Sequence, residues 1–265
     1  MMADDSPKNV LLVTIDSLRY DSWESLKPSL AAGPALEADG TSFSRAFATG
    51  PGTSPSFPAM LCGTLPLSYG GLGPLSVSRP RVALELRERG YATGGFHSNP
   101  FLSRHFDYEV GFDEFNDYQN PLMGVAMRVF PRGIELNNPV LGRIDDLVNL
   151  TGLIKTTYQR FRGKPRPYVA AEVITDDAIE WLERTRDPFF GWVHYMDVHH
   201  PCHPPREDRA AFGVEDVDSE TVSELYSMMI NDSDSLTDRQ TAILENLYRA
   251  AIRYVDRQVG RLVTT

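Results

Sequence analysis

An apolar run from Asn9 to Ile15 ends at a carboxylate, Asp16. The run reads Asn-Val-Leu-Leu-Val-Thr-Ile, and its β-branched and aliphatic residues are typical of a strand buried on both faces of a parallel sheet. Ligands of open α/β sheets bind beyond the carboxyl ends of the strands. We therefore expect an α/β fold with Asp16 at its functional edge.

Asp16 is suited to two different roles. Hard divalent cations prefer carboxylate oxygens, so a carboxylate at a strand end can bind a metal. The alternative is a structural one, because aspartate is also a common N-cap of helices. The residue type alone leaves both roles open.

The rest of the chain alternates between strand and helix patterns, as in a mostly parallel sheet flanked by helices. Its 265 residues suffice for one large α/β domain, 1–265. The expected strands are Ser42–Ala48, Tyr91–His97 and Phe189–Met196. The expected helices are Thr53 to about Cys62, Arg79–Gly90, Tyr168–Arg184, Glu220–Ile230 and Leu236–Val263. The pattern loosens over about 106–167, which we interpret as an insertion or lid.

A hydroxyl-rich helix start follows the break at Gly50-Pro51-Gly52. It contains Thr53 and Ser54, with Pro55 in the first turn of the helix. The free backbone N–H groups and the helix dipole favour an anion here, and a hydroxyl could act as a nucleophile. The alternative for Thr53 is a plain Ser/Thr N-cap.

Histidines gather after the strand expected at Phe189–Met196. Of the six histidines in the chain, four lie between His194 and His203, together with Asp197. Histidines can protonate a leaving oxygen or bind a metal, and such clustering at a strand end favours function over packing.

Composition excludes some classes of function. The formal net charge is −10 and no Lys/Arg run occurs, which argues against a nucleic-acid partner. No apolar stretch approaches the roughly 20 residues that span a bilayer. Two cysteines without a ligand spacing indicate a reducing, cytoplasmic location. The sequence carries no indication of the oligomeric state.

These segments, in this order, resemble the sulfatase family of the alkaline phosphatase superfamily. Residues 9–21 resemble the family's opening strand, and residues 53–63 resemble its signature Cys-x-Pro-Ser-Arg-x-x-x-Leu-x-Gly. The segment His194-Tyr-Met-Asp-x-His-x-Pro201 resembles its strand-end histidine motif, and residues 248–262 are similar to the helix before its last metal-binding strand. The resemblance implies an alkaline-phosphatase-like fold, truncated before that strand and before the C-terminal subdomain.

The chain also departs from the family at three positions. Thr53 stands where the family has a cysteine that becomes formylglycine, or a serine. Phe57 aligns with the arginine that steadies formylglycine, and Ile15 aligns with the first of two opening aspartates. A hydroxyl nucleophile therefore fits better than formylglycine, as in related phosphodiesterases and phosphomutases that use threonine.

The resemblance implies a metal-dependent hydrolase of sulfate or phosphate esters, acting on small molecules or glycans. Thr53, His199 and His194 would be catalytic, and Asp16 would bind Ca²⁺, Mg²⁺, Mn²⁺ or Zn²⁺. The substrate would be bound by Ser54, Asp197 and His203. Two alternatives remain: a phospho-alcohol transferase of the same superfamily, and a catalytically incomplete fragment that only binds. Whether the chain is an active enzyme by itself is left open.

Overall fold

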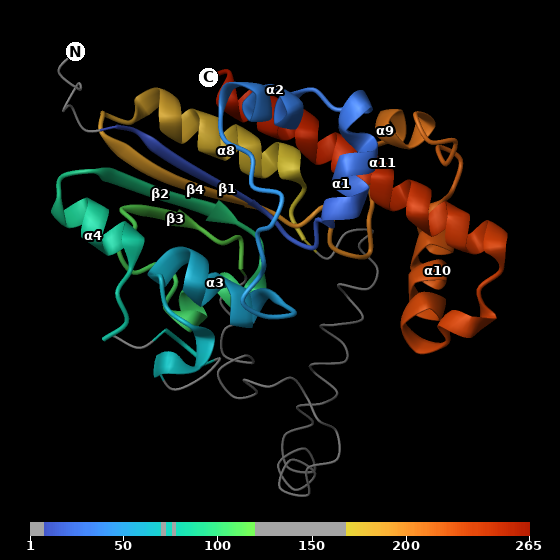
Figure 1. Ribbon diagram of the computed structural model, residues 1–265, viewed down its shortest axis with the longest axis horizontal. Helices are drawn as coiled ribbons and strands as arrows, with labels where there is room; N and C mark the ends of the chain where they lie inside the picture. Colours follow the sequence, from blue (N-terminus) through green and yellow to red (C-terminus); the bar gives the residue numbers. More distant parts are fainter. Residues whose placement is uncertain (1–7, 70–72, 76–77, 120–167) are drawn as a thin grey trace, which may run out of the picture.

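Four parallel strands form the central sheet of the protein. The computed structural model describes residues 8–69, 73–75, 78–119 and 168–265 (Figure 1). The strands, in spatial order, are β1 (Val10–Ile15), β4 (Phe189–Tyr195), β2 (Ala92–His97) and β3 (Glu114–Asn116). All three pairings are parallel, which confirms the α/β fold class expected from the apolar runs.

Helices cover both faces of this sheet (Figure 1). On one face lie α8 (Ala171–Arg184) and the long α11 (Asp238–Val263), with α2 (Ala32–Asp39) packed on α11. On the other face lie α3 (Thr53–Cys62) and α4 (Val82–Glu88). Each layer has its own hydrophobic core, so the central strands β2 and β4 are buried, which explains their apolar sequences. The strand β1, expected to be buried on both faces, is an edge strand of the described sheet and is only half-buried.

Three further helices surround the carboxyl end of the sheet. They are α1 (Tyr20–Leu26), α9 (Arg206–Ala210) and α10 (Ser219–Asn231). Among the described residues, no helix combines the length and the apolar character needed to span a bilayer.

Gly94 at the centre of β2 lets α8 approach the sheet closely. A Cβ at this position would lie 2.6 Å from the Trp181 ring, and the same ring would lie 3.3 Å from a Cβ at Gly191 on β4. Trp181 is 4% exposed and edges against Phe96 and Phe189. The two glycines therefore form the recess that holds this tryptophan.

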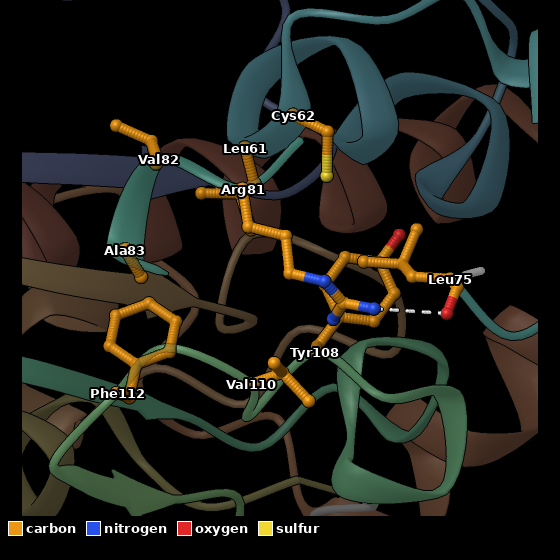
Figure 2. A pocket seen from close by; sticks show the side chains of 9 residues that line it. All are labelled: Leu61, Cys62, Leu75, Arg81, Val82, Ala83, Tyr108, Val110 and Phe112. Carbon is orange, nitrogen blue, oxygen red and sulfur yellow. Dashed lines mark hydrogen bonds between the residues drawn. The ribbon is translucent and has the colours of Figure 1, made fainter. Parts of the chain in front are cut away.

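A small cavity beneath α3 belongs to the packing of this layer. Its volume is about 10 Å³, room for roughly one water molecule. Figure 2 shows the Arg81 side chain running across it, with Nη2 donating to the carbonyl oxygen of Leu75 at 3.0 Å. Cys62, on the same wall, is buried, and burial raises the pKa of its thiol. Cys62 is thus a core residue.

Two parts of the chain are compared with the expectations as follows. Residues 42–48 form no strand; they are exposed, including 76% of Phe43 and 87% of Phe47. Within the stretch expected to be an insertion or lid, about 106–167, residues Glu114–Asn116 form β3 and pair with β2 in the sheet. Its remainder, 120–167, lies outside the described residues.

Candidate functional site

Polar side chains meet where β1, β2 and β4 end. Asp16 directly follows β1, and its N–H donates to the carbonyl oxygen of Tyr195 at 2.9 Å, which extends the β1–β4 pairing by one residue. Asn99 lies two residues beyond β2, and Met196 directly follows β4. The parallel topology thus delivers these side chains to one edge.

Asp16, Thr53 and Asn99 form the centre of this edge. The Thr53 hydroxyl donates to Asp16 Oδ2 at 3.0 Å, and Asn99 Nδ2 donates to the same oxygen at 3.1 Å. Asn99 Nδ2 also lies 3.4 Å from Thr53 Oγ1 and 3.2 Å from Met196 Sδ. The structure therefore joins two residues 37 positions apart, Asp16 and Thr53, through one carboxylate oxygen.

Neither Asp16 nor Thr53 is a helix N-cap, which was the structural alternative for both residues. Thr53 is the first residue of α3, whose N-cap is Gly52, so its hydroxyl is turned to Asp16 instead of capping the helix. The N-cap of α1 is Arg19, three residues after Asp16. Both side chains are thus directed to each other at the positive end of a ten-residue helix.

Asp16 is ionised at neutral pH. Burial alone would raise the pKa of this carboxyl, but the nearby His194 imidazole and the hydrogen bonds from Ser17 and Thr53 outweigh burial and hold the pKa at about 2. Ser17 Oγ donates to Oδ1 at 2.9 Å, while Oδ2 faces Thr53. The carboxylate is consequently a fixed hydrogen-bond acceptor and a weak base.

His194 lies behind Asp16 and is wholly buried. Its Nδ1 is 3.0 Å from Thr14 Oγ1, which accepts a hydrogen bond from Trp192 Nε1 at 3.1 Å. The Thr14 hydroxyl also lies 3.5 Å from the Val193 carbonyl oxygen, so its proton has two acceptors and its contact with Nδ1 suits either tautomer of His194. His194 Nε2 faces Asp16 Oδ2 at 3.6 Å, beyond hydrogen-bond distance.

Phe57 gives a physical reason for one departure from the sulfatase signature. Its ring is 4% exposed and stands edge-on to His194, with ring centroids 4.9 Å apart. It also contacts Trp192 at 5.8 Å. The position is an apolar wall for His194, unsuited to a charged side chain.

The other residues expected in the site are more scattered. Ser54 follows Thr53 in the first turn of α3 and is half-buried. Asp197 is 2% exposed at the end of β4. His203 lines a second cavity, of about 210 Å³, whose lining includes neither Asp16 nor Thr53.

His199 stands on the loop after β4 and is half-buried. Its ring stacks on that of His200, with centroids 4.4 Å apart, and its Nδ1 lies 2.7 Å from the His200 carbonyl oxygen. Within the described residues no hydrogen bond or ion pair joins His199 to Asp16 or Thr53.

Asn99 is the site residue that the sequence analysis missed. It is 1% exposed, and its backbone N–H donates to His97 Nδ1 at 3.2 Å while its Oδ1 accepts from the Phe101 N–H at 3.0 Å. These bonds orient the amide so that Nδ2 faces Asp16. The signal was available, since Asn99 follows a strand end just as Asp16 does.

The described residues do not form a metal site by themselves. No group of three or more His, Cys, Asp or Glu side chains within this part of the chain could hold a cation. Asp16 offers a carboxylate and Thr53 a hydroxyl oxygen, whereas Ca²⁺ takes six to eight oxygens. Asp16 can therefore contribute to a cation site, but it cannot form one with these neighbours alone.

The comparison with protein families is decisive for classification. The family model described as Sulfatase matches residues 8–265. The chain belongs to the sulfatase family. An arylsulfatase of Hemicentrotus pulcherrimus is 27% identical over 214 residues, which are 72% of this chain and 37% of that protein. This sulfatase-family chain thus spans little more than a third of its curated relative.

Solved structures agree on the fold. The phosphonate monoester hydrolase of Agrobacterium radiobacter matches with a TM-score of 0.56 and 19% identity, over 98% of this chain and 59% of that one. A protein solved with its substrate D-glucosamine-2-N,6-O-disulfate matches with a TM-score of 0.59 and 12% identity, over 98% of this chain and 62% of that one. The fold is therefore that of the alkaline phosphatase superfamily, and members of this sulfatase family generally depend on a divalent metal.

Proposed function

We propose that this sulfatase-family chain forms the nucleophile-bearing part of a hydrolase of sulfate or phosphate esters, with Thr53 as the nucleophile. The observation that carries the proposal is the 3.0 Å hydrogen bond from the Thr53 hydroxyl to Asp16 Oδ2 at the start of α3. The bond directs the hydroxyl proton to Asp16, Asn99 Nδ2 donates to one lone pair of Thr53 Oγ1 at 3.4 Å, and the other lone pair is free to attack.

The reaction runs in two displacements. Thr53 Oγ1 gives its proton to solvent water and bonds to the sulfur or phosphorus, while the bond from that atom to the alcohol oxygen breaks. His199, on the loop after β4, protonates the departing oxygen. A water molecule then attacks the sulfur or phosphorus and gives up a proton to His199, and the bond from that atom to Thr53 Oγ1 breaks. Sulfate or phosphate leaves, and Oγ1 takes up a proton from solvent to regenerate the hydroxyl.

Asp16 and Asn99 orient Thr53 in this scheme. With a pKa of about 2, Asp16 is too weak a base to remove the hydroxyl proton. A divalent cation, when bound, supplies the acidification of the hydroxyl that the neighbours of Thr53 lack. Asp16 would hold part of such an ion, while Asn99 keeps the amide donor beside Thr53 Oγ1.

The remaining assignments are proposed with less support from the geometry. Ser54 lies beside Thr53 and would contact the transferred group. His194 supports Asp16 from behind. Asp197 is buried and His203 lines another cavity, so the proposal does not depend on either of them.

The test compares Thr53→Ala with Thr53→Ser in the full-length protein. Turnover of 4-nitrophenyl sulfate and 4-nitrophenyl phosphate should fall by on the order of a thousandfold in Thr53→Ala, because the nucleophilic oxygen is gone. Thr53→Ser keeps that oxygen and should retain turnover within about tenfold. Mass spectrometry of a quenched reaction should find the sulfo or phospho group on residue 53. Equal turnover in wild type and Thr53→Ala would remove Thr53 from the role.

A further inference from the structure

The cavity that His203 lines is a site separate from Thr53. It lies between α9, α10 and α11, which Figure 1 shows together beyond the carboxyl end of the sheet. Its volume is about 210 Å³. A cavity of about 150 Å³ accommodates benzene, so this one has room for a single ring with a head group. We call it the α9–α10 cavity.

The floor of the α9–α10 cavity is apolar. Cys202 and Leu247 are both 0% exposed, Val222 is 1% exposed, and Pro204 is buried with them. Burial raises the pKa of the Cys202 thiol to about 12, so this group is neutral. The floor therefore favours a compact apolar body and offers it no charge.

The rim of the cavity is basic. Arg206 and Arg209 line it from α9, and no Asp or Glu is among the described residues that line it. Arg209 is half-buried, and its Nη1 donates to the Val217 carbonyl oxygen at 2.5 Å. Its Nε is buried and has no hydrogen-bond partner in the described part of the chain. A buried guanidinium N–H without an acceptor is costly, so an acceptor supplied by a ligand would be favourable here.

Asp208 does not neutralise Arg209, although it precedes Arg209 in α9. The Asp208 side chain is wholly buried, and it accepts from Arg253 Nη1 at 3.0 Å and from Arg257 Nη2 at 2.7 Å. Among the ion pairs of the described residues, none joins Arg209 to a carboxylate. The charge of Arg209 is therefore available to an anion that enters the cavity.

Arg206 is paired, but only at the surface. Its Nη2 lies 3.1 Å from Asp216 Oδ1, and the two side chains are 72% and 86% exposed. An exposed pair of this kind contributes little, so an anion in the cavity can compete for Arg206. Asp218, next to Ser219 on the rim, is occupied as the N-cap of α10 and accepts from the Thr221 N–H at 2.7 Å.

We propose that the α9–α10 cavity binds a small organic anion. Its anionic head group, of the carboxylate type, would lie at Arg209 and Arg206, and its compact body of about one ring would pack against Val222 and Leu247. The inference is independent of the role of Thr53, because the lining of this cavity includes neither Thr53 nor Asp16.

The experiment compares three probes that share a ring and differ in charge: benzoate, benzyl alcohol and benzylammonium. Each is titrated calorimetrically into the full-length protein and into its Thr53→Ala variant. Benzoate should bind both proteins equally, benzyl alcohol should bind at least about tenfold more weakly, and benzylammonium should not bind. Hydrogen exchange should show that benzoate protects residues 202–209 and 219–222.

Arg209→Met removes the charge and keeps most of the length of the side chain. It should weaken benzoate binding by about tenfold or more and leave benzyl alcohol binding unchanged. Ser219→Phe fills the rim from an exposed position and repeats the test if the first variant folds poorly. The matched control is Arg239→Met, at an exposed position of α11 outside the cavity, which should bind benzoate as wild type does.

Four results would overturn the proposal. They are failure of benzoate to bind wild type, equal affinity for benzyl alcohol, benzoate binding that survives both Arg209→Met and Ser219→Phe, and benzoate binding lost in Thr53→Ala. The last result would place the probe at the Thr53 site. None of these measurements involves turnover, so the test of Thr53 as nucleophile stands or fails separately.

Discussion

Tyr248 on α11 holds Ser17 in a left-handed backbone conformation. Its hydroxyl donates to the Ser17 carbonyl oxygen at 2.7 Å and accepts from the Arg19 N–H at 2.8 Å. Ser17 has φ 59°, a conformation that costs a residue with a side chain about 1 kcal/mol or more. Because Ser17 follows Asp16 and donates to it, Tyr248 positions the carboxylate that faces Thr53.

Removing this hydroxyl should therefore slow catalysis. In Tyr248→Phe we expect kcat to fall by about tenfold with little change in KM, since a misplaced Asp16 costs transition-state geometry more than binding. Steady-state kinetics on 4-nitrophenyl esters measures both constants, and hydrogen exchange should show faster exchange of the Arg19 amide. Tyr254→Phe is the control. Tyr254 is on α11, as Tyr248 is, but its hydroxyl accepts from the Glu172 N–H of α8 at 3.0 Å, away from Asp16. Equal kcat losses in the two variants would contradict a positioning role.

Asn99 should matter through its amide donor. Asn99→Ala removes the donor to Asp16 and should lower kcat/KM by about tenfold. Asn99→Asp adds a second carboxylate beside Asp16, which raises the pKa of Asp16 and repels an anionic ester, so the loss should reach about a hundredfold. Asn231→Asp makes the same charge change at an exposed position of α10 and should leave kcat/KM unchanged. If Asn99→Asp is no worse than Asn99→Ala, charge at this position is not decisive.

Asp16 is the described residue that we expect to bind a divalent cation. Asp16→Asn in the full-length protein should lower the divalent metal content found by elemental analysis, because a neutral amide binds hard cations more weakly. Asp21→Asn is the matched control, as Asp21 is exposed and paired with Arg19. Equal metal content in wild type and Asp16→Asn would refute this role.

Asp256 should be important for stability. Its carboxylate accepts the N–H groups of Ala31, Ala32 and Gly33 at 2.8, 3.1 and 2.8 Å, and so caps α2 from α11. Asp256→Ala leaves the buried Ala32 donor and the two partly buried donors beside it unpaired, and the free energy of unfolding should fall by about 2 kcal/mol. Asp256→Asn retains one acceptor oxygen and should lose about half as much. Urea unfolding measures both, and equal losses would show that the oxygen is not what matters.

Asp117 should make the protein sensitive to acid. Burial opposes ionisation, but the backbone N–H groups of Arg104 and Gln119 and the Arg104 guanidinium hold the pKa of Asp117 below its ordinary value. A pKa that is lower in the folded state than the unfolded-state pKa of about 4 stabilises the fold at pH values above about 4. This contribution to stability is lost as the pH falls from about 4 through the folded-state pKa. Wild type should thus exceed Asp117→Asn in unfolding free energy at pH 7, and the gap should narrow in acid. A gap independent of pH would contradict the assignment.

The sheet and the start of α3 could be predicted from the sequence because their signals are local. The apolar runs predicted β1, β2 and β4 to within a residue or two, and the Gly52–Thr53 break predicted the start of α3. The three-residue β3 has no such signal, because its place is determined by pairing with β2. Residues 42–48 alternate like a strand but find no partner strand.

The site was harder to predict because its contacts join distant segments. Asn99 reaches Asp16 across 83 residues, and the shared Oδ2 atom follows from topology, not from any motif. The helix pattern at Tyr248–Leu262 pointed to the family, yet its residues turn out to hold other elements in place. Tyr248 fixes the loop after β1, Asp256 caps α2, and a Cβ on Gly260 would come within 3.3 Å of Ala32.

Phe57 limits how the Thr53 site could be redesigned. Exchanging Thr53 for cysteine alone would recreate the reactive position of the formylglycine enzymes without the arginine that accompanies it. Installing that arginine at position 57 would insert a guanidinium between the buried Trp192 and His194 rings, within a layer otherwise packed with hydrophobic side chains. A change from threonine to a formylglycine-type residue at position 53 would therefore also require repacking of the hydrophobic layer on the α3 side of the sheet.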